Sequence, residues 1–245
     1  MANFILVSGA WHGNWCWEYL GPLLRRSGHY VLTPNLAGMG SDERELPKDD
    51  ALRVWADDIA DLVREQEEPV ILVGHSRGGI VISEVAERVC DRIGLLVYLA
   101  GYLVPSGRTL AEMRNTIPSA VTAKRDQVVR LSGDGLYTTV APGASREFFY
   151  NRTSDDRLLH VEQNLSREPV SPSTCPLVLS DERYGTVPRA YIETLHDRAI
   201  SIDLQRWMHT LQSCEHVITL DSDHSPFYSA PAELAGALNS LAHAV

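Results

Sequence analysis

The sequence predicts an α/β protein in which a mostly parallel sheet is flanked by helices and carries one inserted cap. Short apolar runs alternate with amphipathic stretches along most of the chain, and this alternation is typical of repeated strand–helix–strand units. The runs are continuous stretches of Val, Ile, Leu and Tyr, as expected for strands buried on both faces of a parallel sheet. With 245 residues, 44% of them hydrophobic, the chain can fill the core of one large domain.

Six apolar runs are the expected strands, and amphipathic stretches between them are the expected helices. The strands are predicted at residues 4–8, 30–33, 70–74, 95–100, 189–194 and 216–220. Apolar residues recur at three- and four-residue steps within residues 52–63, 80–89 and 234–241, which indicates helices with one buried face.

The region from about Val104 to Gly185 does not show this alternation of apolar strands and amphipathic helices. It contains several Pro and Gly residues and short amphipathic pieces, but no clear core strand. Because a stretch of this length rarely stays structureless in a compact protein, we expect a mostly helical cap over the C-terminal edge of the sheet. The predicted division is a core of residues 1–104 and 186–245 and a cap of residues 105–185.

Charge and cysteine usage narrow the class of partner. The formal net charge is −10, which disfavours binding to nucleic acid or to an anionic membrane surface, because both need clustered Lys and Arg. The first 13 residues read as a buried strand without a signal-peptide pattern, and no apolar stretch approaches a membrane span. The four cysteines show no metal spacing. We therefore expect a cytoplasmic protein without metal or cofactor; a homodimer stays open.

The stretch Gly74-His75-Ser76-Arg77-Gly78 matches the G-x-S-x-G nucleophile elbow. It follows an apolar strand and opens a helical pattern, which is the context that this motif requires. Ser76 would then sit on a sharp turn with its hydroxyl above the sheet. The glycines are expected to avoid collisions across the turn, and Gly79 to let the helix pack close to its neighbours.

A serine nucleophile needs a base that is oriented by an acid, and with this elbow the chain order is serine, acid, histidine. His224 is the expected base, because it follows the last predicted strand in the loop LDSDHSPFYS. Asp197 is the expected acid, because it lies just beyond the strand at residues 189–194. The other candidates for the acid are Asp181, Glu182, Glu193, Asp203, Asp221 and Asp223.

Two backbone N–H groups are expected to form an oxyanion hole, which binds the negative charge that develops on the reacting carbonyl oxygen. One belongs to Arg77, the residue after the nucleophile. The other is expected from Ala10, in the loop that follows the first strand. The neighbouring Gly9 and Trp11, together with Ser225, are tentative pocket residues.

The chain resembles the α/β-hydrolases of the plant methylesterase and hydroxynitrile lyase group and their bacterial esterase relatives. The matching stretches are GAWHGNWCWEYLGPLL, GHSRGG, VPRAYIETLHDRAIS with QRWM, and DHSPFYSAPAEL. The resemblance implies an α/β-hydrolase fold and a cofactor-free hydrolase acting on a small-molecule ester. It places Ser76, Asp197 and His224 on the family's triad positions, and Ala10 and Arg77 on its oxyanion positions.

The lyase branch of this group needs residues that this chain lacks. That branch has a lysine directly after the histidine, where this chain has Ser225, and a threonine where this chain has Gly9. The resemblance therefore favours ester hydrolysis. A ligand-binding receptor with little turnover and a carbon–carbon-bond-cleaving lyase are the alternatives.

The chain departs from its group at two positions. Ser8 replaces the histidine that usually begins the oxyanion loop, and a serine can support that loop only over a shorter reach. Arg77 stands where relatives mostly carry an uncharged residue. Its side chain is expected to pair with a carboxylate away from the chemistry, with Glu43 and Glu84 as candidates. The alternative is that it borders the pocket and attracts an acidic substrate group.

Overall fold

Six parallel strands form the central sheet of the computed structural model, which describes residues 1–117 and 128–243. Their spatial order is β2-β1-β3-β4-β8-β9, and every neighbouring pair is parallel. All six predicted strands are confirmed. They are β1 (Asn3–Val7), β2 (Tyr30–Leu32), β3 (Val70–His75), β4 (Ile93–Leu99), β8 (Arg189–Thr194) and β9 (His216–Leu220).

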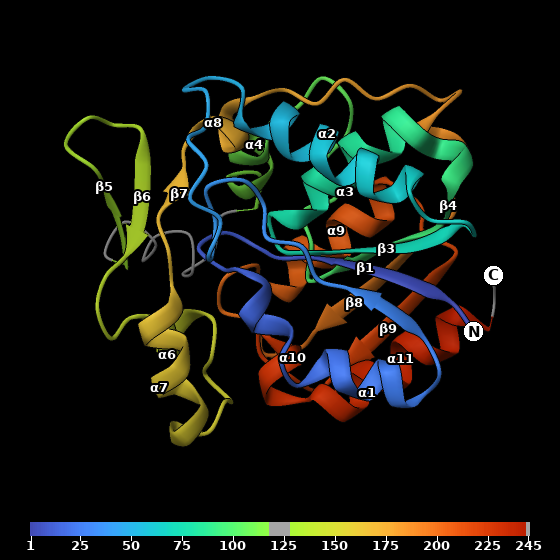
Figure 1. Cartoon of the computed structure of the whole chain (residues 1–245). Helices are drawn as coiled ribbons and strands as arrows, with labels where there is room; N and C mark the ends of the chain where they lie inside the picture. The colour runs from blue at the N-terminus through green and yellow to red at the C-terminus, as the bar shows by residue number, and fades with distance from the viewer. Residues whose placement is uncertain (118–127, 244–245) are drawn as a thin grey trace.

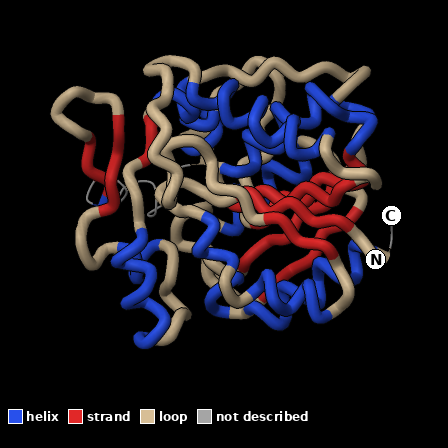
Figure 2. Tube along the Cα trace, in the orientation of Figure 1, coloured by secondary structure: helices blue, strands red, loops and turns tan. Residues whose placement is uncertain are grey.

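Helices cover both faces of this sheet (Figures 1 and 2). One face carries α2 (Ala51–Arg64), α3 (Gly78–Val89) and α9 (Ile202–Leu211). The other carries α1 (Leu20–Arg26), α10 (Pro226–Ser229) and α11 (Pro231–Ala242). Short 3-10 helices in the described chain are η1 (Asn14–Trp17), η2 (Cys90–Arg92) and η3 (Tyr184–Thr186).

The continuous apolar runs of the inner strands arise because these strands are buried from both sides, whereas the outer strands β2 and β9 are partly exposed. In β1, Ile5 and Val7 pack into the cluster under α2 and α3, whereas Phe4 and Leu6 pack into the cluster under α1 and α11. All four side chains are fully buried. Because successive strand residues point to opposite faces, two cores separated by one sheet require apolar residues at every position.

The inserted segment lies between β4 and β8, beside the C-terminal ends of the strands (Figure 1). Besides helices it contains a three-stranded antiparallel sheet that the sequence did not reveal. Its strands are only two to four residues long, too short to show a period. The elements are α4 (Leu110–Arg114), β5 (Val129–Leu131), β6 (Tyr137–Val140), α6 (Ser145–Phe148), α7 (Asp155–Asn164), β7 (Glu168–Pro169) and α8 (Ser171–Thr174).

The boundaries of the cap stay a prediction. Residues 118–127 of the predicted cap lie outside the described residues. Near its other end, Leu177 and Tyr184 already pack into the core with α3. Across the part of the chain that the structure describes, none of the helices combines the length and the apolar character needed to cross a membrane.

Candidate active site

Ser76 occupies the turn between the end of β3 and the start of α3. The glycines around it are required by close backbone approaches. A Cβ at Gly74 would come within 2.6 Å of the Gly78 carbonyl oxygen, and one at Gly79 within 2.4 Å of the Tyr102 carbonyl oxygen. At Gly78 the obstacle is the Val7 carbonyl in neighbouring β1, at 2.8 Å, rather than the turn itself. The elbow thus packs directly against two other segments of the core.

Backbone strain gathers at the C-terminal edge of the sheet. Among the described residues, the non-glycine residues with positive φ are Trp11 (63°), Ser76 (53°) and Ala100 (39°). They follow β1, β3 and β4, which are adjacent strands. Left-handed backbone angles cost free energy in residues other than glycine, and such strain clusters at functional sites. The three strained residues therefore mark this edge as the candidate site.

His224 and Asp197 form a buried pair at the ends of adjacent strands β9 and β8. His224 Nδ1 lies 2.7 Å from Asp197 Oδ2, and the two side chains are 2% and 0% exposed. Because the carboxylate accepts this hydrogen bond, Nδ1 donates it, and Nε2 of the neutral ring is left as an acceptor. An imidazole held in this tautomer can take a proton from a nearby hydroxyl.

The Asp197 carboxylate is fixed by several donors. Oδ1 accepts hydrogen bonds from the N–H groups of Ala199 and Ile200, both at 2.7 Å. Oδ2 also accepts one from Gln205 Nε2 at 3.1 Å, and Gln205 lies on α9. Sequence reasoning missed Gln205, a fully buried polar residue whose role depends on the fold that brings α9 next to Asp197.

Asp223 anchors the loop that carries His224. Its Oδ1 accepts from the Ser225 N–H at 3.0 Å and from Ser229 Oγ at 2.7 Å, and its Oδ2 accepts from the Arg152 N–H at 2.8 Å. It therefore connects the histidine loop to the inserted segment. The structure brings His224 into contact with Asp197 and uses Asp223 as a loop anchor.

His75 has a structural role, because it holds the backbone of the loop that carries His224. Its Nε2 donates to the His224 carbonyl oxygen at 2.9 Å, and the centroids of the two rings lie 4.6 Å apart. Burial, with a smaller contribution from His224, places the pKa of His75 well below its usual range. A neutral His75 adds no positive charge beside His224.

The loop after β1 is held on several sides. Ser8 Oγ donates to the His12 carbonyl oxygen at 3.1 Å, so serine does support this loop through a short local bond. The Trp11 N–H donates to Glu168 at 3.3 Å, and the Trp11 carbonyl accepts from the Ser166 N–H at 2.9 Å. Among the described residues, no hydrogen bond uses the N–H groups of Ala10 or Arg77.

His12 connects this loop to the inserted segment between β4 and β8. Its Nδ1 donates to the Ala10 carbonyl oxygen at 2.6 Å, and its Nε2 accepts from the Tyr150 hydroxyl at 2.5 Å. Burial lowers the pKa of His12 to about 4, and the nearby His224 and Arg77 contribute in the same direction. The folded protein therefore holds His12 neutral, whereas the unfolded chain protonates it near pH 6.5.

Acidification is expected to destabilise the protein through His12. Because the folded-state pKa is depressed, the stability is complete above pH 6.5 and is lost progressively as pH falls toward 4. Urea unfolding should show a loss of about 2 kcal/mol from this residue between pH 7.5 and pH 5. The variant His12→Gln should show a shallower fall, with His75 still contributing. An unchanged pH slope in that variant would contradict the assignment.

Arg77 pairs with Glu168, and the expectation of Glu43 or Glu84 as its partner was wrong. Arg77 Nε lies 2.8 Å from Glu168 Oε1, with side chains 2% and 4% exposed. Arg77 Nη2 also donates to the Gly9 carbonyl oxygen at 3.0 Å, and the guanidinium packs over the Trp55 ring. Glu84 pairs instead with Arg88 on the same helix. The ion pair joins the elbow, the loop after β1 and the inserted segment.

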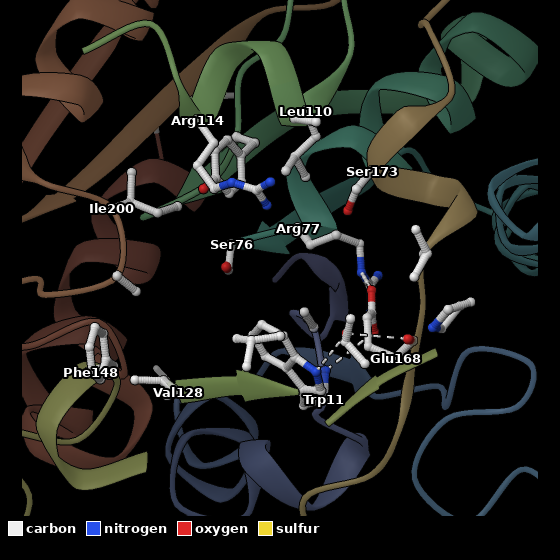
Figure 3. Close-up of a pocket in the computed structure, with 18 of the residues that line it drawn as sticks. Trp11, Ser76, Arg77, Leu110, Arg114, Val128, Phe148, Glu168, Ser173 and Ile200 are labelled. Atoms are coloured by element: carbon white, nitrogen blue, oxygen red, sulfur yellow. Dashed lines mark hydrogen bonds and ion pairs between the residues drawn. The ribbon is translucent and has the colours of Figure 1, made fainter. Parts of the chain in front are cut away.

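A cavity of about 330 Å³ opens beside Ser76 (Figure 3). Its wall is mostly apolar and includes Ala10, Trp11 and Arg77. Gly9 and Ser225 lie outside its described lining: Gly9 packs against His75 and Ser76, and Ser225 is fully buried. Further residues that line the cavity are Leu110, Arg114, Val128, Phe148, Phe149, Glu168, Ser173 and Ile200.

Within residues 1–117 and 128–243, no group of three or more His, Cys, Asp or Glu is placed to hold a metal ion.

Sequence comparison finds esterases among the relatives. Methylesterase 2 of Arabidopsis thaliana is 29% identical over 261 residues, covering 98% of this chain and 95% of that protein. A carbendazim hydrolyzing esterase of Nocardioides sp. is 40% identical over 126 residues, which are 51% of this chain and 52% of that protein. Some relatives are longer: the chain spans 64% of a chloroplastic Arabidopsis protein to which it is 29% identical.

Comparison with solved structures and with family models also finds hydrolases. A pyrethroid hydrolase from Sphingobium faniae superposes with a TM-score of 0.87 at 26% identity, over 99% of this chain and 98% of that chain. The family model described as "Alpha/beta hydrolase family" matches residues 4–237, which is nearly the whole chain. With the parallel sheet and the elbow at Ser76, these matches show that the chain belongs to the alpha/beta hydrolase family.

Proposed function

We propose that this protein is a carboxylic ester hydrolase that acts through Ser76, His224 and Asp197. The observation that carries the proposal is the buried 2.7 Å contact between His224 and Asp197, formed at the strand edge where Ser76 sits in a strained elbow. The esterase relatives support the same reaction class. Acyl transfer by a serine requires a base that is oriented by an acid, and the His224–Asp197 pair supplies such a base at this edge of the sheet.

In the proposed first half-reaction, Ser76 Oγ attacks the ester carbonyl carbon while His224 Nε2 takes the hydroxyl proton. Asp197 holds the imidazole tautomer and stabilises the imidazolium that forms. Collapse of the tetrahedral intermediate breaks the carbon–oxygen bond to the leaving group. The imidazolium returns its proton to the departing alcohol, which leaves an acyl-enzyme on Ser76.

In the second half-reaction, water takes the place of the alcohol. His224 accepts a proton from the water, whose oxygen attacks the acyl carbon. The carboxylic acid then leaves as the proton returns to Ser76 Oγ. Both tetrahedral intermediates carry a negative oxygen, for which the N–H groups of Ala10 and Arg77 are the proposed donors. One such donor contributes about 3 kcal/mol of transition-state stabilisation in comparable enzymes.

A panel of methyl, acetyl, aryl and lactone esters tests this proposal with the purified chain. We expect saturable hydrolysis of at least one class, with an acyl adduct on Ser76 detectable by mass spectrometry under rapid acid quench. Ester affinity without turnover would instead indicate a ligand-binding receptor. Cyanide release from mandelonitrile without ester hydrolysis would indicate a lyase, and either result would overturn the proposal.

A further inference from the structure

We propose that the preferred substrates are esters that carry a second, negatively charged group, and that Arg114 binds this group. The inference rests on the proposed ester hydrolysis and adds the chemical class of the substrate. A half-ester of a dicarboxylic acid has the required chemistry: one ester carbonyl for Ser76 and one carboxylate for a guanidinium.

Arg114 is a half-buried guanidinium in the wall of the cavity that also contains Ser76. Figure 3 shows its side chain across the cavity from Trp11, apart from the Arg77–Glu168 pair. Among the described residues, no hydrogen bond or ion pair includes Arg114. Most other arginines of the described chain pair with a carboxylate or a carbonyl, for example Arg88, Arg108 and Arg206.

The charges along the described wall do not balance. Its charged side chains are Arg77, Arg114 and Glu168, and the carboxylate of Glu168 is already taken by Arg77. One positive charge is therefore left facing a cavity whose wall is otherwise mostly apolar. Low-polarity surroundings strengthen electrostatic attraction and focus it on a ligand of opposite sign. The whole chain carries a net charge of −10 and does not attract anions as a whole. The attraction for an anionic ligand therefore comes from Arg114 within the cavity.

The backbone that carries Arg114 is well anchored. Thr109 Oγ1 accepts from the Glu112 N–H at 3.1 Å, and Glu112 Oε2 accepts from the Thr109 N–H at 2.8 Å, which forms a capping box. Leu110 and Met113 bury the inner face of α4. Arg114 ends this helix, where a cation is favoured by the helix dipole. The guanidinium is thus presented from a fixed element, as specific recognition requires.

An arginine suits a carboxylate better than other anion-binding side chains do. Its planar fork can donate two parallel N–H bonds to the two carboxylate oxygens. The cavity volume of about 330 Å³ limits the ligand to a small one. Ser76 and Arg114 line the same cavity, so one small half-ester within it would place its ester and its carboxylate against a common wall.

The test compares the monomethyl and dimethyl esters of succinic, glutaric and adipic acids. The wild-type protein should hydrolyse at least one half-ester with a higher kcat/KM than its neutral diester. Arg114→Gln should lower kcat/KM for half-esters by roughly tenfold and change diester hydrolysis by less than about twofold. Arg114→Lys should retain part of the preference, and Arg114→Glu should lose more than the glutamine variant.

Arg108→Gln is the matched control. Arg108 precedes the same helix and pairs with exposed Glu112, but it does not line the cavity. Its replacement should leave the half-ester preference unchanged. Equal losses on half-esters and diesters in Arg114→Gln, or a wild-type preference for diesters, would overturn the role of Arg114 and leave ester hydrolysis intact. Failure of the wild-type protein to hydrolyse any ester, the panel above included, would overturn both proposals.

Discussion

Replacing Ser76 with alanine is expected to lower kcat for ester hydrolysis by roughly 10⁵-fold, because the variant lacks the oxygen that forms the acyl-enzyme. The fold should survive. Alanine keeps the Cβ that already fits at φ 53°, and the neighbouring glycines that relieve the turn are unchanged. Initial rates on the best ester of the panel, together with urea unfolding, measure the two expectations separately.

Covalent labelling gives the control for this variant. A fluorophosphonate should add one adduct to the wild-type chain and none to Ser76→Ala. The variant Ser27→Ala removes an exposed serine at the end of α1 and should label and turn over like the wild type. Undiminished hydrolysis by Ser76→Ala, with labelling still present, would show that another residue is the nucleophile.

Much of the fold and of the candidate site could be predicted because the relevant signals are local in sequence. Burial on both faces makes the inner strands of the sheet continuous apolar runs. The elbow requires glycines at fixed spacing, and those residues stand next to Ser76. Asp197 and His224 each follow a recognisable strand, and adjacent parallel strands end at the same edge. The sequence alone thus predicted a pair that the structure places 2.7 Å apart.

What could not be predicted depends on contacts between distant parts of the chain. Glu168 reaches Arg77 across 91 positions, from a strand of two residues that has no pattern of its own. Of the two glutamates proposed instead, Glu43 is exposed and Glu84 pairs with Arg88 one turn along the same helix. The position of Arg114 in the cavity wall, with no ion pair or hydrogen bond among the described residues, was equally hidden, because sequence does not show which arginines have partners. Tertiary pairing decides these roles.

Removing one member of the Arg77–Glu168 pair is expected to destabilise the protein strongly. Both side chains are almost fully buried, so Arg77→Met leaves an unpaired carboxylate and Glu168→Leu leaves an unpaired guanidinium. Breaking a buried ion pair from one side costs about 3–5 kcal/mol, whereas replacing both charges by apolar side chains is often close to neutral. Urea unfolding of the two single variants and the double variant should show this pattern.

In the double variant Arg77→Met/Glu168→Leu, we expect stability to recover but kcat to stay low. Glu168 accepts the Trp11 N–H and Arg77 donates to the Gly9 carbonyl, so the pair holds the two residues that flank Ala10. Arg77→Met/Glu168→Leu should therefore recover stability but keep a reduced kcat, since the loop that presents the Ala10 N–H has lost both of these bonds. Arg53→Met, at an exposed pair, should cost no more than about 1 kcal/mol and leave kcat unchanged. If kcat returned to the wild-type value in the double variant, the pair would stabilise the fold without positioning the oxyanion loop.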